Sequence, residues 1–408
     1  MQKKIYFIES NTTGTGMIAI NKAREYNCEP ILLTNNINLY KELDDEGCSV
    51  IEIDTNCLDV LNTYLSKENR DEIAGIMTTS DFYLETAASL AETYSLYSNS
   101  RNTISICRNK ALLRDKLAST NIKQPKYWVI LSLSDLEQIQ HTVSLPCVIK
   151  PANDSGSNNV RLCMSWKEVE ESATAIFNQS YNARGQKTIS TVLLEEYIEG
   201  PEYSVETFTF EGNTIVVGIT EKRIIGFPYF VEGGHIFPAN ISQKVKSEIE
   251  STVLRVLKKV NYKYGAAHTE VKWTSKGCIL IEINPRLAGG MIPELIRYTT
   301  EVDLISKQVA CSIGINPKID NITNTGYSGI HFLVASQVGT LTQINEMDYV
   351  NIQGIKKKEI KAQLGQKLQL PENFSHRLGY IIVYEKTYLE VVLKLQEVAN
   401  VSIFQIQN

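Results

Sequence analysis

Residues 278–286, with the sequence CILIEINPR, combine an apolar strand with a one-sided polar pattern. Side chains of a strand alternate between its two faces, so Glu282, Asn284 and Arg286 share one face and the intervening isoleucines occupy the other. Burying a carboxylate, an amide and a guanidinium without partners is costly. The pattern therefore predicts a sheet that packs one face on a core and turns the other toward a polar site.

The preceding segment, AAHTEVKW, predicts a second strand that pairs with the first through a hairpin at residues 275–277. This pairing brings Glu270 within reach of Glu282 and Asn284. Two carboxylates and an amide oxygen in a partly buried site repel one another unless a cation lies between them, and hard oxygen ligands favour Mg²⁺. These three residues are therefore the predicted metal ligands, with Mn²⁺ as an alternative ion.

A salt-bridged face is the alternative interpretation of this pattern. Lys272 shares the strand face of Glu270, and Arg286 lies just beyond the second strand, so either cation can neutralise the carboxylates. Arg286 is also followed by Gly289 and Gly290, where the backbone can approach a ligand closely. Its planar fork suits a carboxylate or a transferring phosphoryl group, although an exposed arginine without a ligand explains it as well.

A lysine and a glycine-containing loop predict a phosphate site further upstream. Lys150 closes the apolar strand PCVIK, where an anion would stabilise a buried ammonium. The loop that follows contains Ser155, Gly156 and Ser157, small residues whose backbone N–H groups can close over phosphates. The alternatives are a lysine that reaches solvent where the strand ends, and a plain surface turn.

Residues 193–206, LLEEYIEGPEYSVE, predict a strand that leads through a turn into another strand. The segment from Glu196 to Ile198 can present backbone groups to the edge of an adenine, and Glu202 is placed for ribose hydroxyls. Solvated glutamates beside a turn are the alternative. His235, in the segment VEGGHIFPA, is either a substrate contact or general base, or a structural histidine of the core.

The first hundred residues alternate strands with helices. Strand patterns at residues 3–8, from Pro30 and near residue 75 are separated by helical patterns, the first of which runs from Met17 to Tyr26. Such alternation predicts a parallel sheet and a Rossmann-like domain.

The loop after the first strand contains Gly14-x-Gly16-x-x-Ala19, which fits the dinucleotide fingerprint. That fingerprint also needs an acidic residue at the end of the second strand, where this chain has Thr34-Asn35-Asn36. A nicotinamide oxidoreductase is therefore a remote alternative. Glycines that serve a tight strand-to-helix turn explain the motif.

An α/β chain of three domains is predicted. A charged amphipathic helix over residues 107–120 leads into strands and turns with a hairpin signal at Glu211-Gly212-Asn213, and the remainder mixes strands with short helices. We expect a Rossmann-like N-terminal domain, a central domain with a mobile lid, and a small C-terminal α+β domain. Their predicted bounds are residues 1–105, residues 106–315 with the lid at about 120–190, and residues 316–408.

Net charge and composition limit the partners. The 408 residues carry a formal net charge of -5 and have a pI near 5.7, which gives no basic field for nucleic acid. No apolar run reaches membrane-spanning length, and the first residues lack a signal-peptide pattern. The eight cysteines include no Cys-x-x-Cys pair and are interpreted as reduced thiols of a cytoplasmic protein, without a zinc site or disulfide framework.

Taken in this order along essentially the whole chain, these features resemble the ATP-grasp superfamily. LEEYIEGPEYSV and the strand pair ending in EINPR are its specific elements here. AAHTEVKW, EINPRLAGGMIPEL and GGHIFPA most resemble carboxylate–amine ligases of the L-amino-acid ligase type.

The resemblance implies a role for each matching residue. Lys110, in CRNKALLR, and Lys150 match the lysines that contact the nucleotide phosphates, beneath the loop from Ser155 to Ser157. The remaining matches are the adenine hinge (Glu195, Glu196 and Ile198), the ribose ligand (Glu202), the magnesium ligands (Glu270, Glu282 and Asn284) and the arginine that steadies an acyl phosphate (Arg286).

The implied activity is ATP-dependent amide or peptide bond formation between a small-molecule carboxylate and an amine, which are amino-acid-like. ATP would activate the carboxylate as an acyl phosphate, releasing ADP and then phosphate, and His235 would serve as a base. A carboxylase or a carrier-protein-acylating enzyme is the alternative, and a non-catalytic nucleotide-binding module is a remote one. Relatives of this kind also suggest a homodimer.

Overall fold

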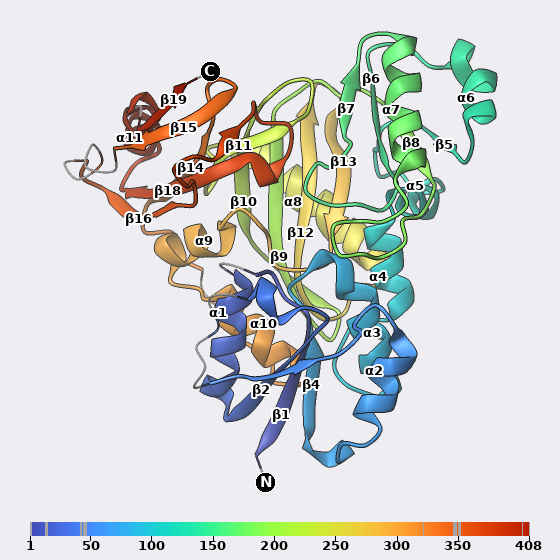
Figure 1. The fold of residues 1–408 in the computed structure, drawn as a ribbon, viewed down its shortest axis with the longest axis vertical. Helices are drawn as coiled ribbons and strands as arrows, with labels where there is room; N and C mark the ends of the chain where they lie inside the picture. Colours follow the sequence, from blue (N-terminus) through green and yellow to red (C-terminus); the bar gives the residue numbers. More distant parts are fainter. Residues whose placement is uncertain are drawn as a thin grey trace.

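The computed structural model describes residues 2–12, 15–40, 43, 47–320, 322–345, 349, 352–401 and 403–407. In Figure 1 the N-terminal region lies at the bottom, a large sheet runs up through the centre to the C-terminal region, and a small four-stranded sheet stands apart at the upper right.

The N-terminal region is a parallel sheet with the order β3-β2-β1-β4, which confirms the predicted Rossmann-like arrangement. In β1, Ile5 and Phe7 face α1, whereas Tyr6 and Ile8 face the opposite layer of helices, and all four are fully buried. A parallel strand covered on both faces is expected to be apolar throughout. The elements are β1 (Lys3–Ile8), α1 (Thr15–Lys22), β2 (Cys28–Thr34), β3 (Ser49–Glu52), α2 (Leu58–Leu65), β4 (Ile73–Met77) and α3 (Leu84–Thr93).

Gly16 lies in the first turn of α1, against the loop that follows β1. A Cβ atom at this position would be 2.0 Å from the carbonyl oxygen of Asn11, so only glycine fits. Gly14, the other glycine of the fingerprint, lies outside the described residues. Gly16 thus allows the loop after β1 to pack closely on the start of α1, a local structural role in line with the simpler interpretation.

The helix predicted over residues 107–120 is instead two helices that meet at Asn109. These are α4 (Arg101–Arg108) and α5 (Lys110–Leu117). The Asn109 side chain accepts hydrogen bonds from the backbone N–H groups of Ala111 and Leu112, so it caps a new helix. The break puts Lys110 in the first turn of α5, where its N–H donates to the Ala152 carbonyl oxygen at 2.8 Å.

The sheet at the upper right of Figure 1 is antiparallel, with the order β5-β8-β6-β7. Helices α6 (Leu133–Ile139) and α7 (Trp166–Asn178) pack on it around an apolar core. The strands are β5 (Tyr127–Ile130), β6 (Cys147–Pro151), β7 (Arg161–Cys163) and β8 (Val192–Glu196). This sheet occupies the segment predicted to be the lid.

The large sheet has eight strands in the order β13-β12-β9-β10-β11-β14-β18-β16. Its hairpins at residues 211–212 and 275–276 confirm the two predicted turns. Helix α8 (Gln243–Lys259) packs against the sheet. The strands are β9 (Glu202–Phe210), β10 (Asn213–Ile225), β11 (Val231–Phe237), β12 (Gly265–Thr274), β13 (Gly277–Asn284), β14 (Tyr327–Val334), β16 (Ile355–Ile360) and β18 (Arg377–Glu385).

The C-terminal region continues this sheet. Strand β14 pairs with β11, so that His235 lies opposite Ile330. Helices α9 (Ile292–Thr300) and α10 (Leu304–Ser312) precede it, and α11 (Tyr388–Asn400) covers β14 and β18. A second small sheet has the order β17-β15-β19, from Lys367–Leu368, Gly339–Ile344 and Phe404–Gln407. The boundary proposed at residue 316 therefore divides regions that share one sheet.

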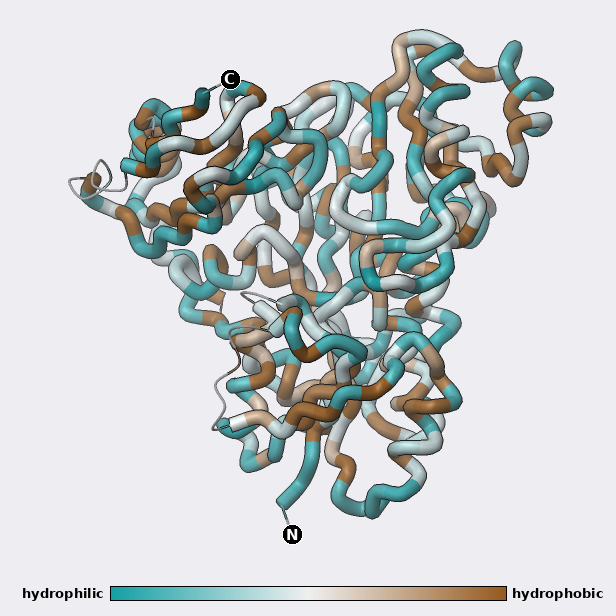
Figure 2. The backbone as a smooth tube through the Cα atoms, viewed as in Figure 1, coloured by the Kyte–Doolittle hydropathy of each residue, from teal (hydrophilic) through white to brown (hydrophobic). Residues whose placement is uncertain are grey.

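Figure 2 shows hydrophobic residues concentrated in the strands of the N-terminal region, where β1 is buried from Ile5 to Ile8. All eight cysteines are free thiols, and six of them are buried. Within the part of the chain that the structure describes, no helix combines the length and apolar character needed to cross a bilayer.

Gly234 sets the spacing between β11 and β14. A Cβ atom there would be 2.4 Å from the Ile330 carbonyl oxygen, so Gly234→Ala pushes apart two hydrogen-bonded strands. We expect the free energy of unfolding to fall by about 1–3 kcal/mol, measured by urea denaturation. Gly289→Ala is the matched control, because no atom lies within 4 Å of the Cβ atom that alanine would add there; equal losses in both variants would contradict this account.

Candidate active site

The three predicted metal ligands lie together on β12 and β13. Glu270 is directly opposite Glu282 in the strand register. Asn284 lies two residues further along β13, and its Nδ2 donates to Glu282 Oε1 at 2.8 Å. The hairpin therefore brings these side chains to one face, as the alternation of the sequence predicts.

Cations already contact both carboxylates. Lys110 Nζ lies 3.1 Å from Glu282 Oε2, and Lys222 Nζ lies 2.8 Å from Glu270 Oε2. His268 Nε2 is 3.1 Å from the other oxygen of Glu270. Burial alone would raise the pKa of Glu282, but Lys110 and other nearby groups hold it well below its usual range. The carboxylates are therefore anionic.

In the alternative interpretation, Lys272 or Arg286 neutralises the carboxylates of this face. The structure pairs both cations with other groups. Lys272 Nζ donates to the Ile198 carbonyl oxygen at 3.0 Å, and Arg286 Nη2 pairs with Asp81 Oδ2 at 2.5 Å. A face with salt bridges does exist, but its cations come from other elements, α5 and β10.

The donor set fits a hard divalent cation. Two anionic carboxylates and an amide side chain converge from adjacent strands, at a point where the protein places ammonium groups next to the same oxygens. Among the described residues there is no cluster of three His, Cys, Asp or Glu side chains arranged to hold a metal. The amide of Asn284 would therefore have to complete the site.

Lys150 is held by a buried carboxylate. Its Nζ lies 2.6 Å from Glu195 Oε2, and the fully buried Arg114 places Nε 2.8 Å from Glu195 Oε1. Burial would raise the pKa of Glu195, but the charges of Arg114 and Lys150 keep it below its ordinary value. Arg114 Nη2 also donates to the Ile281 carbonyl oxygen at 2.7 Å, which ties this cluster to β13.

The Glu195 side chain is 3% exposed, and both of its oxygens contact the two cations. It positions Lys150, which leaves only the Glu195 backbone for the predicted hinge. Glu196, the next residue on β8, points outward and is exposed, and its N–H donates to the Lys126 carbonyl oxygen at 2.8 Å.

The serine–glycine loop lies close to Lys110, whose Nζ donates to the Asp154 carbonyl oxygen at 3.2 Å. Ser155 N–H donates to the Asp154 side chain, and Gly156 has a φ of +73°, a conformation that favours glycine. The Ser157 hydroxyl donates to the Phe230 carbonyl oxygen at 3.4 Å. The loop is thus fixed between the lysine and the turn after β10.

The hinge segment after β8 lies beside Lys272. Ile198 is buried, and the Lys272 ammonium that contacts its carbonyl oxygen also lies over the rings of Tyr197 and Phe230, at 5.2 and 5.7 Å. Burial lowers the pKa of Lys272. Glu202 begins β9 next to this segment.

Lys222 joins several parts of the site, although no sequence pattern singles it out. Its Nζ lies 2.9 Å from Glu202, 3.0 Å from Glu232 and 2.8 Å from Glu270. Burial would lower the pKa of Lys222, but these carboxylates raise it well above its ordinary value. The ammonium is therefore charged.

His235 is fully buried on β11, and neither ring nitrogen has a hydrogen-bond partner among the described residues. Its Nε2 lies 3.6 Å from Glu232 Oε2, and its ring packs edge-on against Phe332. Burial lowers its pKa, so the imidazole is neutral at neutral pH. Gly290 lies against the same ring, since a Cβ atom there would be 2.7 Å from Nε2.

Arg377, from β18 of the C-terminal region, completes this side of the site. Its Nη2 donates to Glu232 Oε2 at 2.8 Å and to the Glu232 carbonyl oxygen at 3.0 Å. The guanidinium stacks on Phe332 at 3.7 Å from the ring centroid. The Glu232 carboxylate therefore has cations on two sides, Arg377 and Lys222.

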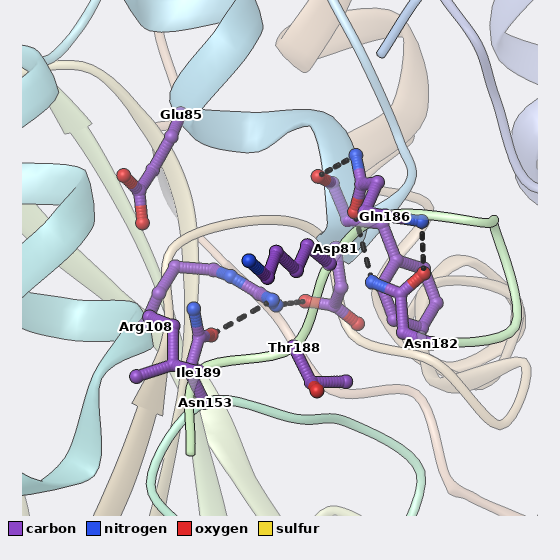
Figure 3. Close-up of a pocket in the computed structure, with 10 residues that line it drawn as sticks. Asp81, Glu85, Arg108, Asn153, Asn182, Gln186, Thr188 and Ile189 are labelled. Carbon is purple, nitrogen blue, oxygen red and sulfur yellow. Dashed lines mark hydrogen bonds and ion pairs between the residues drawn. The ribbon is translucent and has the colours of Figure 1, made fainter. Parts of the chain in front are cut away.

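Arg286 is anchored by the N-terminal region. Asp81 contacts Arg286 through one oxygen and Arg108 through the other, the latter at 3.2 Å. Asp81 and Arg108 also line a small cavity of about 80 Å³, shown in Figure 3, together with Asn153, Asn182 and Gln186 among others. Space of this size accepts a few water molecules or a small polar group.

Sequence reasoning missed several residues that belong to the site, among them Asp81, Arg114, Lys222, Glu232 and Arg377. Arg114 alone carried a usable signal, because it follows Lys110 by four residues and shares its helix face.

Comparisons with known proteins identify two domains in this chain. Residues 143–294 match the ATP-grasp domain, and residues 331–401 match the L-amino acid ligase C-terminal domain 2. An uncharacterized protein, y4rH of Sinorhizobium fredii, is 29% identical over 94% of this chain and 78% of its own length. Human carnosine synthase 1 is 26% identical over 46% of this chain, which spans only 23% of that relative.

A solved structure has the same fold. The L-amino acid ligase of Bacillus licheniformis superimposes with a TM-score of 0.84 at 21% identity, with each chain covered completely. The chain thus contains an ATP-grasp domain followed by a C-terminal domain of the L-amino acid ligase kind, which confirms the predicted fold and resemblance. It belongs to the ATP-grasp carboxylate–amine ligases, enzymes that use ATP to form C–N bonds.

Asp81→Asn should separate Arg286 from its anchor. Loss of a buried charge between two arginines is expected to lower the free energy of unfolding by about 3–5 kcal/mol at pH 7. Burial raises the pKa of Asp81, but the arginines hold it below its ordinary value. Its contribution is therefore present above the unfolded pKa of about 3.9 and is lost as the pH falls through the lower folded value.

Urea denaturation of the wild-type protein and of Asp81→Asn between pH 3 and 7 measures the difference between their free energies of unfolding. This difference should become smaller below about pH 4. A difference that stays constant across the series would contradict the role given to the Asp81 carboxylate.

Proposed function

We propose that the enzyme joins two amino-acid-like substrates through an acyl phosphate, with ATP bound between the small and the large sheets. The observation that carries the proposal is the contact between Lys110 Nζ and Glu282 Oε2 at 3.1 Å. This contact places the proposed phosphate-binding lysine directly beside a proposed metal ligand. Lys150 lies in the same neighbourhood, since its charge also lowers the pKa of Glu282.

The residues take the following roles in this proposal. Lys110, Lys150 and the loop from Ser155 to Ser157 contact the phosphates. The adenine hinge is formed by the backbone of Glu195, Glu196 and Ile198, while the Glu195 side chain holds Lys150 and Glu202 contacts the ribose. Mg²⁺, or Mn²⁺ in its place, would be held by Glu270, Glu282 and Asn284. The bound ion would supply charge at the phosphate oxygens.

The reaction proceeds in two steps on these residues. A substrate carboxylate attacks the γ-phosphorus of ATP, so that an acyl phosphate forms and ADP leaves. The amine of the second substrate then attacks the acyl carbon and orthophosphate leaves. Arg286, held in place by Asp81, stabilises charge on the transferring phosphoryl group and on the acyl oxygen.

His235 is proposed as the group that receives a proton from the attacking amine. It is neutral because burial lowers its pKa, and its ring nitrogens, which lack hydrogen-bond partners among the described residues, can accept. Glu232, 3.6 Å from Nε2, would stabilise the imidazolium that results.

The substrates are proposed by analogy with the relatives. The C-terminal match and the B. licheniformis structure point to L-amino acids, and carnosine synthase 1 is named for making carnosine. A carboxylase is the second candidate, since biotin carboxylase structures share the fold. We also propose that the enzyme is cytoplasmic and forms a homodimer.

A substrate screen tests the proposed function. The enzyme with ATP and Mg²⁺ is offered all pairs of proteinogenic amino acids, and ADP release is measured with mass spectrometry on the products. We expect ADP and a dipeptide in equal amounts for some pairs. A requirement for bicarbonate, or for a thiolated carrier protein, would instead favour the second candidate.

Glu282→Gln and Asn284→Ala test the metal assignment. Each removes a proposed ligand oxygen, and we expect substrate-dependent ADP release to fall by a factor of about 10²–10³ or more, with the fold retained by circular dichroism. Glu397→Gln, an exposed carboxylate on α11 paired with Lys394, is the control and should retain full turnover. Full turnover in either site variant would refute the metal assignment.

His235→Asn tests the proposed base. The slow step becomes amine attack, so kcat should fall by a factor of about 10²–10⁴, while the affinity for a non-hydrolysable ATP analogue stays unchanged. Loss of nucleotide affinity together with kcat would show that His235 serves the structure and not proton transfer.

A further inference from the structure

Lys222 occupies the centre of the large sheet, on β10 between β9 and β11, and lies opposite His235 in the strand register. Its side chain is only 2% exposed. The three carboxylates around its Nζ come from three strands: Glu202 from β9, Glu232 from β11 and Glu270 from β12.

These carboxylates belong to different parts of the proposed site. Glu202 is the proposed ribose ligand, Glu270 a proposed metal ligand, and Glu232 the neighbour of His235 on the substrate side. Other cations reach each of them singly: Lys272 lies 3.9 Å from Glu202, His268 3.1 Å from Glu270, and Arg377 2.8 Å from Glu232. Lys222 is shared by all three.

We propose that Lys222 is a positioning residue: its ammonium orients one carboxylate each on the nucleotide, metal and substrate sides of the site, and so couples these sides. It holds Glu270 in place before the metal arrives and competes with the metal for Glu270 Oε2. This inference rests on the proposed function, because it uses the metal role of Glu270.

Competition predicts the direction in which the Mg²⁺ affinity changes when Lys222 is removed, and a lysine with only a structural role would not produce a change in that direction. Lys222 Nζ lies 2.8 Å from Glu270 Oε2, an oxygen that a bound ion would also use. Removing the ammonium frees this oxygen and makes the pocket more negative, so Mg²⁺ should bind more tightly. Turnover should fall at the same time, because Glu202 and Glu232 lose the cation that orients them. A lysine that only supports the fold would instead weaken Mg²⁺ binding when removed.

Calorimetric titration of Mg²⁺ into protein saturated with a non-hydrolysable ATP analogue measures whether the Mg²⁺ dissociation constant rises or falls. We expect the Mg²⁺ dissociation constant of Lys222→Met to decrease by a factor of about five to ten, within the range of ordinary site coupling. Lys222→Arg keeps the charge and should stay near wild type. Lys22→Met removes a lysine from an ion pair at the N-terminal domain, with Glu25 and Asp303, and is the control.

A double-mutant cycle tests the link to the substrate side. Glu232→Gln leaves Lys222 with fewer carboxylates and so strengthens its hold on Glu270, which should weaken Mg²⁺ binding. If Lys222 transmits this effect, the effect should shrink in the Lys222→Met background. Loss of a direct attraction between the Glu232 carboxylate and the metal would instead give additive effects. Additivity, or Mg²⁺ binding that is unchanged or weaker in Lys222→Met, would overturn the proposal.

The double variant also serves if Lys222→Met does not fold. Lys222→Met combined with Glu232→Gln removes one cation and one anion, and its Mg²⁺ affinity is then compared with that of Glu232→Gln alone; tighter binding supports the proposal and equal or weaker binding overturns it. The proposed function fails separately, if the wild-type enzyme releases no ADP with any substrate pair.

Discussion

Compensation of buried carboxylates by ammonium and guanidinium groups is the interaction on which this site depends. Glu195 is a buried anion and Glu270 a partly buried one, and each has two cationic or imidazole partners within 3.1 Å. Removing one partner of such a cluster leaves a buried charge unpaired, which costs several kcal/mol. The positions of the lysines are therefore fixed by the same contacts that keep the carboxylates ionised.

These contacts also tie separate regions of the chain together. The N-terminal region contributes Asp81, which orients Arg286 after β13, and the C-terminal region contributes Arg377, which holds Glu232 on β11. Lys110 on α5 reaches Glu282 on the large sheet. The candidate site therefore draws on all of these regions, and the C-terminal region contributes to it although all of the predicted site residues lie before residue 316.

Local periodicity accounts for what the sequence could predict. The strand alternation around Glu282 and the hairpin before it placed Glu270 opposite Glu282, because register in a hairpin is set by the turn. Lys222 and Asp81 could not be found in this way, because Glu270 and Arg286, the partners that place them in the site, lie far away from them in the chain. The helix break at Asn109 depends on a capping side chain that a charged amphipathic pattern hides.

The distribution of charge also supports the proposed metal. Lys110 and Lys150 are already paired with Glu282 and Glu195, so neither brings an uncompensated positive charge to an incoming triphosphate. A nucleotide with several negative charges would then enter next to anionic oxygens and be repelled. A divalent cation between those oxygens and the phosphates, as proposed, would remove this repulsion while the lysines stay in place beside the carboxylates. Charge balance therefore favours the proposed metal.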